Sequence, residues 1–368
     1  MRHIAIVFRV PGYAFMTGAI HLVLIIGAVW STTCRAEGGD GIPSELRTPN
    51  YRITKLSGIG YDKDLNRQDP SNVIKVGDRY YVWYTQRKRR GVHPYAATVY
   101  YATSKDGLTW DDQGQALGKG RAGEWDSFGV ITPYVAVYDG KYYLYYTGTS
   151  PKGDFKSRGP DGTLRHIGVA IADSPDGPWK KFDRNPILSP DEDNHWENLL
   201  VDDAHVIRRN GKFWFYYKGG HQTVKTCDTQ WGLAIGDRPT GPFIRHNANP
   251  LIGGHTVCVW PHREGIAGLI DSAGSEAHTV QWSADGLHFQ RAAKVDRVLT
   301  GCGPYDPDAF TNTDYGDGIR WGVAQYREKG TLCIVRFDVD CKVPPDTDKQ
   351  ATPMSNKKLD GSAKTGRP

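Results

Sequence analysis

The chain has 368 residues, of which 39% are hydrophobic, 24% charged and 11% aromatic, and this composition argues against disorder over most of its length. Its 43 glycines and 22 prolines are scattered without a period, which excludes collagen, while 3 methionines beside 20 tyrosines and 11 tryptophans argue against a helical repeat. The formal net charge is +5.

The N-terminal segment has the pattern of a secretory signal peptide. Arg2 and Arg9 precede an apolar run at 17–30 that is short for a membrane span, and a small-residue site follows at Ala36. We therefore predict a signal peptide over 1–36, a secreted or periplasmic protein, and no stable membrane span after cleavage. An uncleaved anchor and lipidation of Cys34 are the alternatives.

The apparent basicity comes partly from this segment. Removing 1–36 leaves 43 basic against 41 acidic residues, about +2, and so weakens the electrostatic argument for nucleic-acid binding. The one basic run is Arg87-Lys88-Arg89-Arg90. It is interpreted either as a solvated loop or as a contact for an anionic, for example sulfated, glycan.

Cysteine usage allows disulfides in an exported protein without fixing their pairing, and it suggests no zinc site. Five cysteines follow the predicted cleavage site, so at least one is left unpaired and the connectivity is open. No CxxC pair or His/Cys spacing suggests zinc.

Along the chain, one pattern recurs five times. A polar or acidic residue opens an alternating apolar strand, which turns at Gly or Asn-Gly and returns as an aromatic-rich strand. The copies lie at 68–85, 131–147, 201–217, 260–270 and 305–324. Most are followed by a second hairpin signal, such as Asp106-Gly107 or Asp285-Gly286.

Two hairpins per copy predict an all-β fold, a five-bladed β-propeller of four-stranded antiparallel blades. The predicted organisation is an N-terminal extension at 37–59, the propeller at 60–341 with a closing strand at 332–339, and a disordered tail at 342–368.

The starts of the inner strands carry the chemistry. Asp69, Thr132, Asp203, Trp260 and Asp306 are matched across the five copies, and three of them are acids. Because inner strands line the central channel, these positions are expected to converge. Clustered carboxylates raise one another's pKa, so one can stay protonated while another is ionised, as glycosidic hydrolysis requires.

These residues resemble a known group of enzymes. The segments 67–74, 123–133, 201–207 and 254–262 resemble the five-bladed propeller glycoside hydrolases of the family 43 and 32 superfamily, and most closely family 117. The resemblance covers residues 60–340. It implies an exo-acting, inverting α-1,3-(3,6-anhydro)-L-galactosidase that hydrolyses neoagaro-oligosaccharides.

The resemblance also implies residue roles. Asp69 corresponds to the general base that activates water, and Asp203 to the acid that tunes the proton donor. The donor is left open between His262, matching family 117, and Glu264, matching family 43. The expected substrate-binding residues are Asn72, Trp125, Asp126, Thr132, Asp202, His205, His255 and Asp306.

Several alternatives stay open. The chain could be a family 43-like arabinofuranosidase or xylosidase, or a non-catalytic carbohydrate-binding propeller; a fructosidase and a protein-interaction propeller are less favoured. The expected partner is an oligosaccharide or polysaccharide, with no nucleic acid. No cofactor is expected to be required, although a divalent cation could occupy the acidic channel. Family 117 members usually carry a swapped helical N-terminal segment, for which the short 37–59 extension leaves little room, so a monomer is expected.

Overall fold

The computed structural model describes residues 40–344, except 151–162, 192, 194–195, 222–228, 272, 297–299, 308 and 310–313. The chain divides into Met1–Ala36 and Glu37–Pro368, and every described residue belongs to the second unit. The predicted signal peptide and most of the predicted tail lie outside the described residues. No helix among those described is long and apolar enough to cross a membrane.

The described residues are almost entirely β-strand, with one 3-10 turn, η1, at Ser44–Leu46. The strands are β1 (Tyr51–Lys55), β2 (Leu65–Gln68), β3 (Ile74–Val76), β4 (Arg79–Lys88), β5 (Thr98–Ser104), β6 (Trp110–Leu117), β7 (Gly129–Tyr138), β8 (Lys141–Ser150), β9 (Leu164–Ala172), β10 (Lys180–Lys181), β11 (Leu200–Arg209), β12 (Lys212–Gly220), β13 (Gln230–Gly236), β14 (Ile244–Arg245), β15 (Ile252–Gly253), β16 (Val259–Arg263), β17 (Gly265–Ile270), β18 (Thr279–Ser283), β19 (Gln290–Lys294), β20 (Gly303–Pro304), β21 (Gly316–Glu328) and β22 (Thr331–Lys342).

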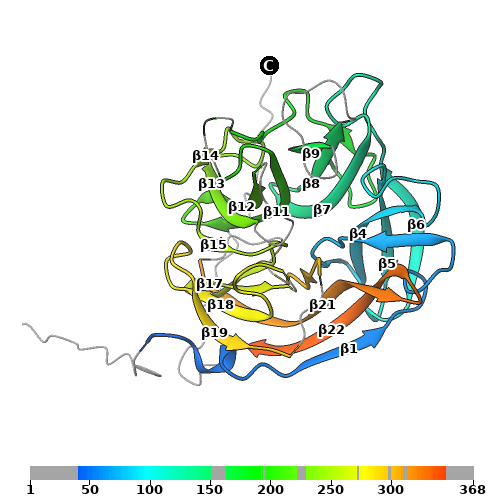
Figure 1. Cartoon of the computed structure of the whole chain (residues 1–368). Coiled ribbons are helices and arrows are strands. Elements are labelled where there is room, and N and C mark those ends of the chain that lie inside the picture. Colours follow the sequence, from blue (N-terminus) through cyan, green and yellow to red (C-terminus); the bar gives the residue numbers. More distant parts are fainter. Residues whose placement is uncertain are drawn as a thin grey trace, which may run out of the picture. The chain divides into compact units, whose positions relative to one another are not determined.

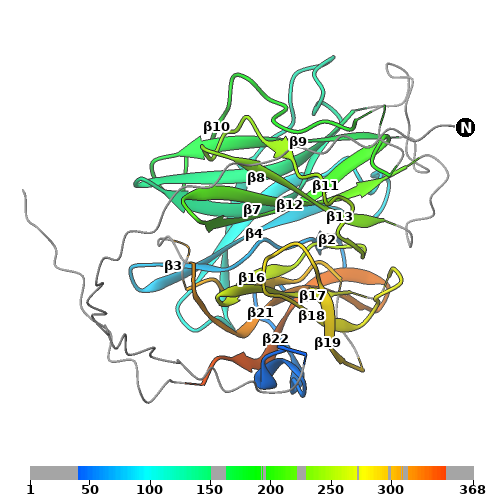
Figure 2. The same cartoon turned by 90° about the vertical axis from the view of Figure 1, so that its left-hand side faces the viewer.

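Neighbouring strands pair mainly antiparallel in curled groups, as the recurring sequence pattern predicted. Short pairings of β9 with β11 and of β16 with β21 join these groups into three hydrogen-bonded sheets. The first group is β2 and β3 with β4, β5 and β6; the second is β7 to β10; the third is β11 to β15; the fourth is β16 to β19. The last contains β20, β21 and β22. Figure 1 shows these groups arranged around a common centre within the second unit, and Figure 2 shows the same strands from the side.

The hairpin turns form where the chain has residues that tolerate a left-handed backbone. Asp139-Gly140 joins β7 to β8, and both residues have positive φ, 51° and 71°. Asn210-Gly211 does the same between β11 and β12, with φ of 51° and 72°. These are the turn residues that match the twist of paired strands.

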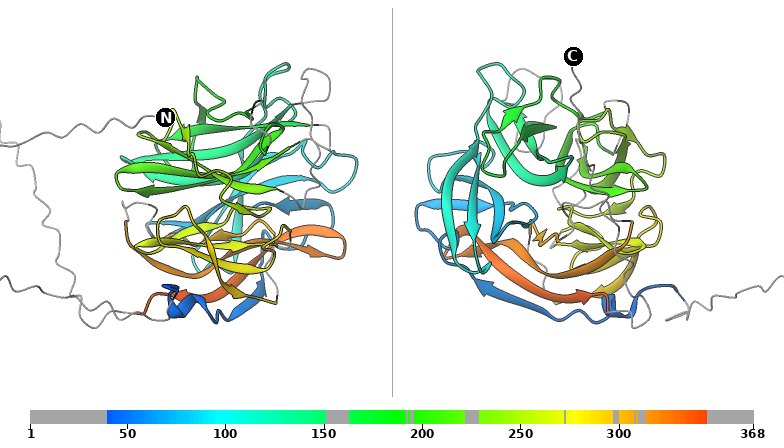
Figure 3. Two further views of the ribbon diagram at one scale, coloured as in Figure 1. Left: turned by 60° about the vertical axis from the view of Figure 1, so that its left-hand side comes forward. Right: turned by 180° about the vertical axis from the view of Figure 1, so that it is seen from behind.

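The last group is completed by the N-terminal extension. β1 pairs along its whole length with β22, for example Ile53 with Phe337, so the outermost strand comes from the beginning of the chain (Figure 3). The expectation that 332–339 would be the closing strand was therefore incomplete, because β22 lies between β21 and β1. An outermost strand from the opposite end of the sequence leaves no signal in a local repeat.

The hairpin registers correct the matching of the fourth and fifth copies. In the second, third and fourth groups, the last strand pairs before the inner hairpin turn are Tyr138–Lys141, Arg209–Lys212 and His262–Gly265. The residues six positions before the first member of each pair are Thr132, Asp203 and Thr256, in the same order. Thr256, not Trp260, therefore occupies the matched position in the fourth group.

In the fifth group, the strand pair Gly303–Val323 corresponds to the pair Tyr134–Tyr145 of the second group. Gly301 lies two residues before that pair, as Thr132 does before its own, and has a φ of 61°. Gly301 therefore replaces Asp306 as the matched residue, which places Asp306 five residues further along.

The core fills the spaces between the faces of adjacent groups. One cluster joins the first two groups through Trp83, Val130, Leu144 and Tyr146, all fully buried. Trp125 and Trp196 each lie over two glycines: a Cβ on Gly148 would be 2.1 Å from Trp125, and one on Gly219 2.3 Å from Trp196. These tryptophans pack into the fold.

Candidate active site

Three of the matched positions share an unusual backbone. Asp69, Thr132 and Asp203 have φ angles of 46°, 47° and 53°, in the left-handed region that residues with a Cβ rarely adopt. In the second and third groups the strand register shifts at this point. A bulge of this kind re-aims side chains, and strain repeated at matched positions is a marker of function.

Two buried cations hold the paired aspartates of β11. Lys218 Nζ lies 2.6 Å from Asp203 Oδ2 and 3.3 Å from Asp202 Oδ2, and Arg165 Nη1 lies 2.9 Å from Asp202 Oδ2. The Thr147 hydroxyl donates to Asp202 Oδ1 at 2.7 Å. Thr132 Oγ1 lies 3.0 Å from the same oxygen. Four charges are thus buried with partners, as buried ions must be.

The two aspartates have opposite protonation tendencies. Burial raises the pKa of Asp203 to about 7; Lys218 opposes the shift, while the charges of Asp202 and Asp69 reinforce it. Burial also acts on Asp202, but Lys218 and Arg165 outweigh it and hold the pKa of that carboxyl well below its usual range. Asp202 therefore stays ionised, and Asp203 is poised to titrate near neutrality.

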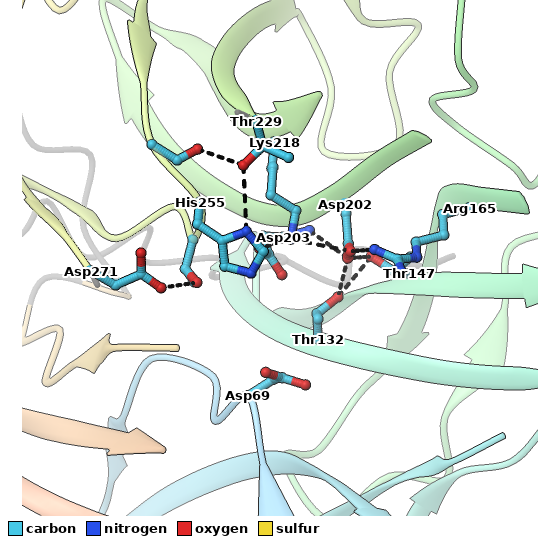
Figure 4. Close-up of polar contacts among 12 residues, drawn as sticks. Asp69, Thr132, Thr147, Arg165, Asp202, Asp203, Lys218, Thr229, His255 and Asp271 are labelled. Carbon is cyan, nitrogen blue, oxygen red and sulfur yellow. Dashed lines mark hydrogen bonds and ion pairs between the residues drawn. The ribbon is translucent and has the colours of Figure 1, made fainter. Parts of the chain in front are cut away.

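Asp69 faces this cluster from the end of β2 (Figure 4). Gln68 Nε2 donates to Asp69 Oδ2 at 2.9 Å. Burial raises the pKa of Asp69; the Gln68 hydrogen bond opposes the rise, and the charge of Asp202 adds to it. A Cβ on Gly301 would lie 3.3 Å from Asp69 Cα, so the matched residue of the last group approaches Asp69 closely through its backbone.

His255 enters the same region from the fourth group. Its Nδ1 lies 3.4 Å from Thr229 Oγ1, and the Thr229 hydroxyl donates to the Gly254 carbonyl at 3.0 Å. Since that hydroxyl has only one hydrogen, Nδ1 must be the donor in its contact with Thr229. This orients the other ring nitrogen, Nε2, away from Thr229.

The neighbour of His255 continues the polar network. The Thr256 hydroxyl donates to Asp271 Oδ2 at 2.8 Å, and Figure 4 shows Asp271 beside His255. Burial raises the pKa of Asp271, while Thr256 and the charge of Lys218 oppose the rise. The electrostatic effect of Lys218 thus links the fourth group to Asp202 and Asp203.

The structure therefore gathers five of the sequence-predicted residues: Asp69, Thr132, Asp202, Asp203 and His255. The two candidate proton donors are placed elsewhere. His262 is fully buried, and its Nε2 lies 2.9 Å from Glu45 Oε1 of the N-terminal extension. Glu264 is exposed in the turn between β16 and β17, and its carbonyl accepts from Arg209.

Strand geometry explains this departure from expectation. His262 lies six residues beyond Thr256, and a strand advances about 3.3 Å per residue, so it sits roughly 20 Å along from the matched position. The segment that carried the resemblance was right, but the histidine that enters the cluster is His255.

Other predicted substrate contacts are used inside the protein. Asn72 exchanges both amide hydrogen bonds with the backbone of Val135, at 2.9 and 3.0 Å. Buried His205 accepts from the Val259 amide at 3.4 Å, and burial lowers the pKa of His205 to about 3.

Asp126, Trp125 and Asp306 also lie outside the cluster. Asp126 is 1% exposed and pairs with Lys181 at 2.6 Å and with the Tyr146 hydroxyl at 3.0 Å. Trp125 stacks on Tyr146 with ring centroids 5.6 Å apart. Asp306 lines small cavities with Tyr134 and Pro261, along the inner strands beyond the matched positions.

Sequence reasoning missed Lys218, Thr147, Asp271 and Arg165. The first three occupy one repeat position on the returning strand, where Thr85 stands in the first group. The change from Tyr-Tyr-Thr to Tyr-Tyr-Lys between copies was the available signal. Arg165, on β9, had no such signal.

No metal site is indicated in the part of the chain that the structure describes. No group of three or more His, Cys, Asp or Glu side chains there is placed to hold a metal ion. Cys258, Cys333 and Cys341 are buried free thiols.

Comparison with known proteins shows that this all-β fold, with its buried carboxylate cluster, is that of a glycoside hydrolase. The family model described as "Glycosyl hydrolases family 43" matches residues 64–202. A xylosidase/arabinosidase of Bacteroides ovatus is 30% identical over 147 residues, which are 37% of this chain and 41% of the relative. The chain therefore spans less than half the length of this curated relative.

The structural comparison is more extensive. A family 117 glycoside hydrolase produced by the marine bacterium Zobellia galactanivorans is 30% identical, with a TM-score of 0.72, over 81% of this chain and 92% of that one. An endo-arabinase from Bacteroides thetaiotaomicron, 14% identical with a TM-score of 0.51 over 78% of this chain and 97% of that one, shares the fold. This chain belongs to glycoside hydrolase family 117.

Proposed function

We propose that this protein is a secreted, exo-acting, inverting glycoside hydrolase that releases the terminal sugar of neoagaro-type oligosaccharides. The observation that carries the proposal is the gathering of Asp69, Asp203 and His255 around the buried Lys218 and Asp202 pair. The family 117 relationship supports the substrate class. In the same proposal, the five strand groups are five propeller blades, cleavage follows Ala36, and the protein is a monomer.

Asp69 is the general base in this mechanism. Its raised pKa makes the carboxylate a stronger base than that of an exposed aspartate. It removes a proton from a water molecule, whose oxygen attacks the anomeric carbon from the face opposite the leaving group. The configuration at that carbon is therefore inverted.

His255 takes the role of proton donor in place of His262 and Glu264. Thr229 holds the protonated Nδ1, so the proton to be transferred is the second one, carried by Nε2 in the imidazolium form of His255. Nε2 delivers this proton to the glycosidic oxygen as the bond of that oxygen to the anomeric carbon breaks, and His255 is left neutral. Asp203, with Lys218 beside it, sets the electrostatic potential between base and donor and is placed to accept a sugar hydroxyl.

Turnover tests the base directly. Purified protein is incubated with neoagarobiose, neoagarotetraose, and arabino- and xylo-oligosaccharides, and monosaccharide release is followed with Asp69→Asn alongside. Asp139→Asn is the matched control, because it is the same change at another left-handed backbone position, in the exposed β7–β8 turn. Loss of a positioned base is expected to lower the rate by about 10²–10⁴-fold, with the control unchanged.

Two results would contradict the proposal. Full activity in Asp69→Asn removes the base assignment, and release of internal fragments from neoagarotetraose before any monosaccharide removes exo action. Proton NMR of the first product tests inversion, since the anomer released must be opposite to the substrate linkage.

A second candidate is an arabinofuranosidase or xylosidase. The family 43 match over residues 64–202 and the Bacteroides ovatus relative favour it. Release of arabinose or xylose, without cleavage of neoagarobiose, decides for this candidate.

A further inference from the structure

Arg87 lies beside the acid cluster but takes no part in it. Arg87 is on β4, two residues beyond Thr85. Thr85 pairs with Gln68 of β2, and the Gln68 side chain donates a hydrogen bond to Asp69. Side chains alternate along a strand, so Arg87 shares the face of Thr85. That face borders the site, because Thr85 Oγ1 accepts the Thr132 amide at 2.9 Å.

The charge of Arg87 is not neutralised by the described residues. Its Nη1 donates to the Lys88 carbonyl at 3.2 Å, and its buried Nε has no hydrogen-bond partner in the described part of the chain. Burial lowers the pKa of Arg87, and the charge of Arg327 acts in the same direction, while the charge of Asp69 opposes both. A half-buried guanidinium near a second arginine is costly unless an anion joins it.

The residues that follow Arg87 in the chain are also positively charged. A hollow of about 500 Å³ is lined by Lys63, Asp64, Leu65, Lys88, Arg89 and Arg90. Arg89 donates to the Lys63 and Lys329 carbonyls, at 3.4 and 3.3 Å, so its position is fixed by neutral groups. Asp64 pairs with Lys63 at 3.0 Å and leaves the arginines in excess.

We infer that Arg87, with the cationic hollow beyond it, is a subsite for an anionic group of the substrate, a sulfate ester or a carboxylate on a sugar next to the cleaved bond. The planar guanidinium suits both groups, since its parallel N–H donors match two oxygens of either. The inference rests on the proposed function, because the position of Arg87 matters through its proximity to Asp69.

Binding of single sugars tests the subsite without turnover. Galactose, galactose 6-sulfate and galacturonic acid are titrated into the protein and into Arg87→Met, which keeps the length of the side chain and removes its charge. Arg79→Met is the matched control, since Arg79 is exposed at the other end of β4 and on the same strand face. Melting temperatures check that the variants fold.

One charge-assisted pair predicts about a tenfold tighter dissociation constant for an anionic sugar than for galactose. That preference is expected to vanish in Arg87→Met and persist in Arg79→Met. A preference for the sulfate or for the carboxylate identifies the group. Equal binding of all three sugars, binding of none, or an equal loss in the Arg79 control overturns the subsite.

The titration also separates this inference from the proposed function. If Arg87-dependent preference is found but no oligosaccharide is cleaved, the subsite stands and the proposed hydrolysis fails. If neoagaro-oligosaccharides are cleaved and the preference is absent, the hydrolase stands without the subsite.

Discussion

Lys218→Met is the most informative perturbation of the acid cluster. Lys218 is 4% exposed and contacts Asp203 at 2.6 Å and Asp202 at 3.3 Å, so methionine leaves Arg165 as the cation that contacts this pair. Breaking a buried pair by removing one partner costs about 3–5 kcal/mol. Protonation of Asp203, whose pKa is already about 7, limits that cost towards the lower end at neutral pH.

The same variant changes the pH dependence of catalysis. The charge of Lys218 lowers the pKa values of Asp69 and Asp203. Without it, both carboxyls ionise at higher pH, so the acidic limb of the kcat/KM profile must move to higher pH. The opposite movement would require Lys218 to disfavour a neighbouring carboxylate, which its charge forbids.

The assay combines a pH–rate profile with thermal unfolding. Lys212→Met is the control, because Lys212 begins the same strand and pairs at 2.5 Å with Asp237 on the surface, where solvent screens the ion pair. An acidic limb that stays fixed or moves to lower pH in Lys218→Met, with the fold intact, would refute the electrostatic account of the site.

Three further changes test other contacts. His255→Asn is expected to lower kcat by about 10²–10⁴-fold on oligosaccharides and far less on an aryl glycoside whose leaving group needs no proton. Equal losses on both substrates would argue against His255 as the proton donor. Glu45→Gln removes the carboxylate that pairs with Arg263 at 2.8 Å and with His262. Burial opposes ionisation of Glu45 but Arg263 lowers its pKa, so the loss of melting temperature should be largest near neutral pH and fade as the pH falls below about 4. A loss that stays constant with pH would contradict the ionic role of Glu45. Gly148→Ala should destabilise by about 1–3 kcal/mol in chemical unfolding, since its Cβ would lie 2.1 Å from Trp125, while Gly123→Ala, with open space around its Cβ but a φ of 88°, reports the backbone term alone.

Much of the fold could be predicted from local pattern. Asp139-Gly140 and Asn210-Gly211 form the expected hairpin turns, because such turns need a left-handed backbone that Asp, Asn and Gly tolerate. The alternating strands that these turns join followed from the same segments. Asp69, Thr132 and Asp203 were matched correctly because each opens an aromatic-rich hairpin of similar length.

What the sequence determined by itself was therefore most of the strands, two of the acids that open them, Asp69 and Asp203, and the glycoside hydrolase class. Tertiary structure decided which histidine joins those acids, because a hairpin register selects His255 over His262 and register is not visible in composition. It also decided the partners of the charges. Lys218, Arg165 and Asp202 come from three strands, and their pKa values depend on burial and distance, which exist only after the strands have packed.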